Sequence, residues 1–289
     1  MSSTALGLVL LAALMHATWN LAAKRAQGDQ LFLLLCSVLA LFLYAVPVAF
    51  VLASAGLPRT ALEWLVMVAS SLLHIGYSSV LQRAYREADL SVVYPVARGT
   101  GPLLTVGLAS WLLGERPSAW ALVGIVVVIV GVFLLAGGTT LFRSRDARVR
   151  AGLVWGAGTG LFIASYTTVD AYAIRGLALS PFLLDYLSHV LRVGGSAPYA
   201  WRRRAELRAE WKRTFRYALV IAVLGPVGYI LVLTALRTTP VSYVAPAREL
   251  SMLFGAFLGA RFLSEGEVVR RVACALLIGV GVAMIALSR

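Results

Sequence analysis

The sequence predicts an all-α integral membrane protein, with ten transmembrane helices arranged as two inverted five-helix repeats around a central cavity. Three observations support this fold class. Of the 289 residues, 60% are hydrophobic and 13% are charged, whereas a soluble domain carries about 25% charged residues. The apolar residues gather in blocks close to the ~20 residues that cross a bilayer as a helix. The two halves of the chain also share one sequence pattern.

The apolar blocks define the expected spans in chain order. They cover residues 3–23, 31–53, 61–84, 89–112, 117–137, 151–174, 180–200, 214–236, 240–262 and 267–287. The basic segment 143–150 separates the first five from the last five, so we expect a first repeat at 1–142, a linker at 143–150 and a second repeat at 151–289. Because five is odd, the second repeat must enter the membrane in the opposite sense, which is a common architecture of transporters.

The repeated pattern centres on two arginines. The first copy, Tyr94–Glu115, reads YPVARGTGPLLTVGLASWLLGE, and the second, Val244–Glu265, reads VAPARELSMLFGAFLGARFLSE, so Arg98 corresponds to Arg248. An arginine at mid-membrane depth costs about 2.5–3.5 kcal/mol even on the lenient insertion scale, and such a residue usually has a partner and a function. The pair therefore predicts a pseudo-symmetric polar site inside the membrane.

Basic residues predict the orientation of the spans. The loops after the first, third, fifth, seventh and ninth spans hold two, two, four, seven and three Lys and Arg residues, together 18 of the 26. The positive-inside rule places these loops in the cytoplasm and both termini outside. The first span has no basic residue before it, unlike a cleavable signal peptide, and is expected to be retained. The polar stretch 201–216 is expected to be a cytoplasmic loop on anionic headgroups rather than a nucleic-acid patch.

Polar and aromatic residues gather on the first, third, fourth, sixth, eighth and ninth spans, which we expect to surround the cavity. The candidate solute-binding residues are His16, Trp19, Asn20, His74, Tyr77, Tyr94, Arg98, Tyr166, Asp170, Tyr229, Tyr243 and Arg248. The second, fifth and tenth spans are expected to face lipid. The seventh span is an exception, and its Asp185, His189 and Arg192 are expected to form an internal salt-bridged face.

Two other groups of residues have mainly structural interpretations. Gly152, Gly156 and Gly160 recur every four residues, and so do Gly255 and Gly259, which is typical of close helix packing in membranes. Glu115 and Glu265 stand at span ends, where capping and loop packing explain them better than solute contact. Cys36 and Cys274 lie in apolar spans without metal-ligand spacing and are expected to be small hydrophobes.

The charges suggest what the cavity binds. Two guanidiniums favour a carboxylate, phosphonate or phosphate group, and the aromatic residues suit an apolar or cationic part of the same solute. Asp170, Arg248 and Glu249 are candidates for coupling or gating, while a structural pair of Arg98 with Asp170 is an open alternative. Because Gly99, Gly101 and Pro102 allow a bend after Arg98, we expect Arg98 to contact the solute and Arg248 with Glu249 to couple or gate.

These residues resemble the EamA family of the drug/metabolite transporter superfamily along essentially the whole chain. The most specific segments are Leu112–Leu135 and Phe262–Ile285, where Gly114-Glu115 keeps the Gly-Glu pair of the family and Ser264-Glu265 keeps only the acid. The segment Met15–Arg25 looks like the first-helix signature of bacterial members, and Ser165–Gly176 looks like its counterpart. The resemblance implies ten helices, two inverted repeats and alternating access, but no particular substrate.

The expected function is secondary active transport of a small polar organic solute across the bacterial inner membrane. No GxxxxGK[ST] motif is present to bind ATP, so the energy would come from a gradient, with a proton as the expected coupling ion. No cofactor, metal or nucleic acid is expected, and a monomer would suffice. Two alternatives remain open, a broad exporter of drugs or amino acids and, from another class, a membrane-embedded enzyme, which the lack of a catalytic pair or HExxH spacing disfavours.

Overall fold

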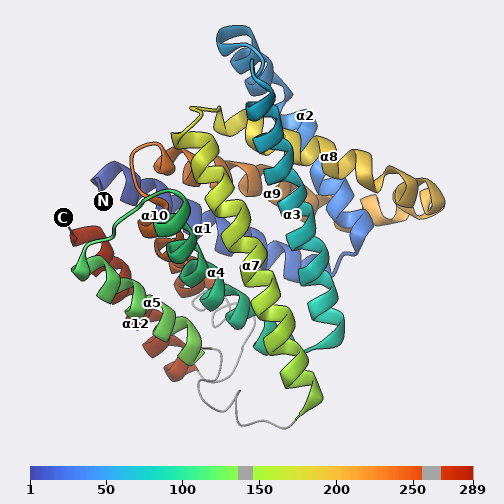
Figure 1. The fold of residues 1–289 in the computed structure, drawn as a ribbon. Helices are drawn as coiled ribbons and strands as arrows, with labels where there is room; N and C mark the ends of the chain where they lie inside the picture. The colour runs from blue at the N-terminus through green and yellow to red at the C-terminus, as the bar shows by residue number, and fades with distance from the viewer. Residues whose placement is uncertain (136–145, 256–267, 289) are drawn as a thin grey trace.

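The computed structural model describes residues 1–135, 146–255 and 268–288, and these form helices joined by short connections, with no strand among them. The helices with defined bounds are α1 (Ser3–Ala26), α2 (Gln30–Ala55), α3 (Ala61–Glu87), α4 (Leu90–Leu112), α5 (Ala119–Leu135), α7 (Ala147–Arg175), α8 (Pro181–Arg202), α9 (Arg204–Leu236), α10 (Val241–Ala247) and α12 (Val268–Leu287). Each falls on one of the expected spans (Figure 1).

Among the described residues, four helices, α1, α2, α3 and α9, are both long and apolar enough to cross a membrane. Large apolar side chains point outward from the bundle, among them Phe42, Val46 and Phe50 on α2 and Trp111 on α4, each more than 70% exposed. A soluble monomer rarely presents contiguous apolar surface of this kind. The outward faces therefore suit contact with lipid.

Two connections differ from the expectation. The stretch 201–216 is helical rather than a loop, because α9 starts at Arg204, and the joined ends of α8 and α9 project beyond the other helices (Figure 1). Its Arg, Lys, Glu, Ala and Leu residues are strong helix formers, and the ion pairs Arg203–Glu206 and Glu210–Arg213 add i,i+3 support. The expected span 240–262 is interrupted, since α10 ends at Ala247 and helical structure resumes at 250.

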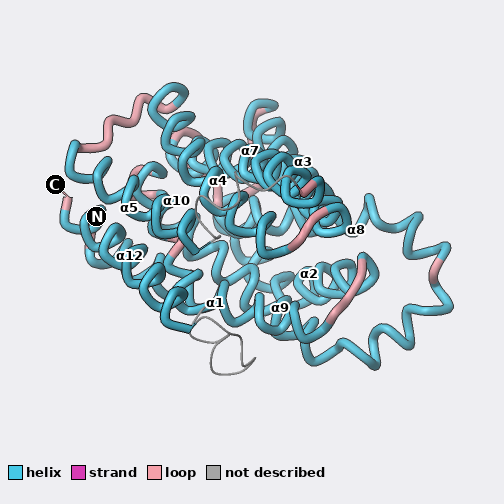
Figure 2. Tube along the Cα trace, turned by 90° about the horizontal axis from the view of Figure 1, so that it is seen from below, coloured by secondary structure: helices cyan, strands magenta, loops and turns pink. Residues whose placement is uncertain are grey.

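The two halves of the chain interlock rather than sit apart. The most extensive contacts pair a helix of the first half with one of the second, namely α4 with α7, α1 with α9, and α5 with α12. Figure 2 shows these helices side by side along the bundle. Each of these three contacts therefore joins the two halves of the chain.

Glycines set the closest of these contacts. A Cβ on Gly156 of α7 would lie 2.8 Å from Val96 Cβ, and one on Gly160 would lie 3.0 Å from the Gly101 nitrogen, which confirms the predicted close packing of α7. Gly255 meets no described atom within 4 Å, and Gly259 lies outside the described residues. The prediction is therefore confirmed for α7 only.

The helices α5 and α12 also approach each other closely at glycines. A Cβ added to Gly281 would lie 2.7 Å from the Gly124 carbonyl oxygen. Their opposite faces carry exposed residues such as Val126 and Leu276. Each of the two helices thus buries its glycine face against the other, and only the opposite face is available for the lipid contact that the sequence predicts.

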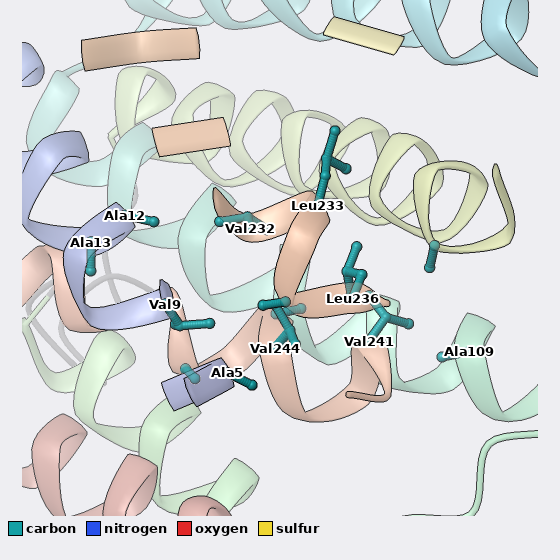
Figure 3. Close-up of a cluster of buried hydrophobic side chains, with 14 of the residues drawn as sticks. Ala5, Val9, Ala12, Ala13, Ala109, Val232, Leu233, Leu236, Val241 and Val244 are labelled. Carbon is teal, nitrogen blue, oxygen red and sulfur yellow. The ribbon is translucent and has the colours of Figure 1, made fainter. Parts of the chain in front are cut away.

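An apolar cluster closes one end of the bundle. It brings together Ala5 and Val9 of α1, Leu233 of α9, and Val241 and Val244 of α10 (Figure 3). Both chain termini lie at this end (Figure 1), where the Met1 ammonium donates a hydrogen bond to the Ala286 carbonyl at 3.1 Å. A surface cavity of about 830 Å³ lies beyond the cluster, between the termini and the segments 112–116, 171–176 and 238–243.

Candidate functional site

A second cavity, of about 440 Å³, lies on the other side of the apolar cluster. Ala12 of α1 and Val232 of α9 belong both to the cavity lining and to the apolar cluster, so they mark the boundary between the two. Ten of the twelve candidate solute-binding residues line it, namely His16, Trp19, Asn20, His74, Tyr77, Tyr94, Arg98, Tyr166, Tyr229 and Arg248. The structure therefore brings together side chains that are spread over five helices and the turn after α10.

Arg98 is held by groups from three directions. Its Nη1 atom lies 3.3 Å from Oε1 of Glu249, which belongs to the other half of the chain. Its Nη2 atom contacts His16 Nε2 and lies 3.4 Å from the Ser251 hydroxyl. Arg98 is 8% exposed and Glu249 is 2% exposed. The Arg98 guanidinium is thus largely occupied by protein partners, and Asp170 is not one of them.

Arg248 lies at the interruption between α10 and the helical segment 250–255. Pro246 precedes it, and the amide nitrogen of Glu249 donates to the Pro246 carbonyl at 3.0 Å, a tightened i→i+3 turn. The bend that the sequence allows after Arg98 is not formed, because α4 continues unbroken to Leu112. In the described part of the chain, the Arg248 guanidinium makes no hydrogen bond or ion pair, although its residue lines the cavity.

Asp170 lies behind the cavity wall rather than in it. Its carboxylate accepts hydrogen bonds from the hydroxyls of Ser70 and Tyr229, and His74 Nε2 is 3.9 Å away. The His74 ring packs on the Tyr166 ring at 4.0 Å between centroids, and His74 Nδ1 lies 2.9 Å from the Ser70 carbonyl. Asp170 is 1% exposed, so it positions cavity side chains from outside.

Tyr243 also lies away from the cavity. Its hydroxyl accepts a hydrogen bond from the Ser118 nitrogen at 3.2 Å, and it lines the surface cavity near the termini. Nearby, the Glu115 carboxylate accepts hydrogen bonds from the backbone nitrogens of Val241 and Ser242, both at 2.9 Å, and from Arg175 at 2.7 Å. Glu115 thus caps α10, as the capping interpretation expected, while Glu265 lies outside the described residues.

Two further helices contribute to the cavity against expectation. On α8, Asp185, Ser188, His189 and Arg192 line it, whereas sequence analysis assigned this helix to an internal salt-bridged face. On α2, the expected lipid-facing helix, Leu33, Cys36 and Ser37 do so as well. The i, i+4, i+7 spacing of the charged residues on α8 was the signal that could have placed that face at the cavity.

Comparison with known proteins identifies the family. The model of the EamA-like transporter family matches the chain in two halves, over residues 3–137 and 150–287. The chain belongs to this family. It is therefore a multi-pass membrane protein of a transporter family and not an enzyme, which removes the membrane-embedded enzyme as an alternative.

Other comparisons bear on the fold alone. A crystal structure of another protein, 19% identical in sequence, superimposes with a TM-score of 0.73 and covers 99% of each chain. No curated protein matches the chain. The substrate of this EamA-like protein must therefore be argued from its own cavity.

Proposed function

We propose that this EamA-like protein is a secondary active transporter of the bacterial inner membrane that carries a small polar organic solute bearing an anionic group. The observation that carries the proposal is the Arg248 guanidinium, which lines the cavity without a hydrogen-bond or ion-pair partner among the described residues. Arg248 is partly buried, and a cation at membrane depth without a counter-ion is costly. A carboxylate, phosphonate or phosphate group of the solute would supply that counter-ion in a bidentate geometry.

The geometry favours exchanging the roles expected for the two arginines. Arg98 already has Glu249, His16 and Ser251 as neighbours, so a solute would have to displace one of them. No group in the described ranges accepts a hydrogen bond from the Arg248 side chain, so its donors can bind a ligand. We therefore assign solute binding to Arg248, and gating to the Arg98–Glu249 pair.

The aromatic residues define the rest of the solute. Trp19, Tyr77, Tyr94 and Tyr166 line the same cavity as Arg248, and the Tyr77 and Tyr166 rings stand edge to face at 5.7 Å. Aromatic faces bind apolar groups and stack on flat ones. An organic anion with an apolar body matches both the free guanidinium and this wall.

The Arg98–Glu249 pair suits a gate because it joins the two repeats. The two residues are 151 positions apart, and each sits in the corresponding segment of its repeat. In an inverted repeat, alternating access rocks one half against the other around a fixed site. Breaking and remaking this pair would accompany that movement, while the apolar cluster around Val9 and Leu236 keeps the end near the termini closed.

The first prediction tests the anion site. Purified protein should be stabilised by benzoate more than by the neutral benzamide, because only the carboxylate can pair with Arg248, and ligand binding raises the apparent melting temperature by mass action. Replacing Arg248 with Gln is expected to remove this difference. Arg237→Gln, which changes an exposed arginine outside the cavity, should keep it.

Two results would contradict the anion site. Equal stabilisation by benzoate and benzamide would favour the broad exporter of amphipathic compounds, in which the aromatic wall dominates. Loss of the benzoate effect in Arg98→Gln but not in Arg248→Gln would return solute binding to Arg98. Folding of each variant is checked beforehand by size-exclusion chromatography.

The orientation has a separate test. The two termini lie at one end of the bundle (Figure 1), and the segments that follow the first, third, fifth, seventh and ninth spans carry 18 of the 26 Lys and Arg residues of the chain. We propose that the termini face the periplasm and the basic loops the cytoplasm. A reporter that is active only in the cytoplasm is expected to be inactive when fused after Arg289, and activity there would reverse the topology.

A further inference from the structure

Three carboxylates of the described residues belong to the cavity and its surroundings, and they differ in how far they are sealed by protein. The Asp170 side chain is 2% exposed and the Glu249 side chain is 3% exposed, and neither residue lines the cavity. The Asp185 side chain is 11% exposed and does line it. Asp185 is therefore the carboxylate of the three that a proton can reach directly from the cavity.

The three carboxylates also differ in their hydrogen bonds and ion pairs. Asp170 has hydroxyl donors on both oxygens, from Ser70 and Tyr229, and Glu249 is paired with Arg98. Within the described ranges, the Asp185 carboxylate accepts no hydrogen bond, and its nearest ionisable partner is His189, whose Nε2 atom is 3.7 Å from Oδ2. A proton on Asp185 would thus displace no existing donor.

Other ionisable groups surround Asp185 from each helix that packs against α8. His74 and Tyr77 line the cavity from α3, and Cys36 and Tyr44 come from α2, with the Tyr44 hydroxyl donating to the Val223 carbonyl at 2.8 Å. Tyr229 lines the cavity from α9, and the charges of Asp170 and of Arg192 act on Asp185. Arg192 is turned toward α3, where its Nη2 atom lies 3.3 Å from the Ser78 hydroxyl.

We infer that Asp185, with His189 beside it, binds the coupling proton of the transport cycle. This inference rests on the proposed function. It assigns the coupling proton to Asp185 in place of Asp170, Arg248 and Glu249, the candidates for coupling or gating predicted from the sequence. The proton enters from the open cavity and converts the Asp185 carboxylate to the carboxylic acid, and His189 Nε2 lies nearby, 3.7 Å from Oδ2. Asp and His side chains at membrane depth are the proton carriers of many pumps and transporters.

The decisive experiment observes the proton itself and needs no solute. Infrared difference spectra of the protein in lipid nanodiscs are recorded between about pH 9 and about pH 6, a range in which exposed carboxylates remain almost fully ionised. The wild type is expected to gain the C=O stretching band of one protonated carboxyl group at the lower pH. Asp185→Asn should lose this band, Asp185→Glu should restore it at a shifted frequency, and Glu206→Gln, an exposed carboxylate on α9, should leave it unchanged.

His189 supplies a second variant in case Asp185→Asn does not fold. His189→Gln is expected to keep the band and to shift its titration midpoint, since the carboxyl group loses its neighbouring base. The inference would be overturned if the band persisted in Asp185→Asn. It would also be overturned if Asp170→Asn lost the band and Asp185→Asn did not. If the band behaves as expected while benzoate fails to bind through Arg248, the proton site stands and the anion site falls, so the two proposals fail separately.

Discussion

Replacing Glu249 with alanine is expected to destabilise the protein by about 3–5 kcal/mol, the usual cost of leaving one member of a buried ion pair alone. Arg98 would keep His16 and Ser251 as neighbours, but neither carries the negative charge that Glu249 supplies at 3.3 Å. With Arg98 only 8% exposed, water cannot replace that charge fully. The measurement is equilibrium unfolding in detergent micelles, compared with Glu206→Ala on the exposed surface of α9.

A double variant separates the pair from its surroundings. Arg98→Met with Glu249→Leu removes both charges together and is expected to recover most of the lost stability, since apolar replacements of a buried pair are often neutral or stabilising. The same variant should lose transport if the pair forms a gate. A Glu249→Ala protein as stable as the wild type would show that Arg98 does not depend on this partner.

The second large effect is expected at the contact of α5 with α12. In Gly281→Ala the new Cβ would lie 2.7 Å from the Gly124 carbonyl oxygen and 2.8 Å from the Val128 nitrogen. Both are backbone atoms, so no side chain can rotate away and the helices must separate. Overpacking of this kind costs about 1–3 kcal/mol, and Gly281→Leu should cost more.

Gly279 on the same helix provides a matched control. A Cβ there meets no described atom within 4 Å, and alanine is the better helix former by about 1 kcal/mol. Gly279→Ala is therefore expected to be neutral or stabilising while Gly281→Ala destabilises. Thermal unfolding of the two single variants measures the difference, and equal melting temperatures would contradict the close contact between α5 and α12.

Much of the fold was predictable because it depends on local properties of the chain. Hydropathy and helix length are set within about 20 residues, so the helices fall where the apolar blocks predicted them. The departures have local causes too. Strong helix formers extend α9 back to Arg204. The ninth span is interrupted at Arg248, two residues after Pro246. In α4, Pro95 and Pro102 are accommodated without a break.

The residues that line the cavity were largely predictable from the sequence, but their hydrogen bonds and ion pairs were not. Spacing along each helix selected ten residues that line the cavity, yet it also selected Asp170 and Tyr243, which lie outside it. It missed Asp185, His189 and Arg192 because the face that α8 turns to the cavity depends on its packing against α2, α3 and α9. Helical periodicity identifies a shared face but not what that face contacts.

By itself, the sequence determined that this is a helical membrane protein with two related halves and an arginine in the same place in each, because hydropathy and repetition are read along the chain. Only the tertiary structure decided which arginine is engaged. Glu249 is next to Arg248 in sequence but pairs with Arg98, since adjacent residues in a turn or helix point in different directions. Long-range packing between the halves thus leaves the Arg248 guanidinium without a hydrogen-bond or ion-pair partner among the described residues, and we propose that the solute binds there.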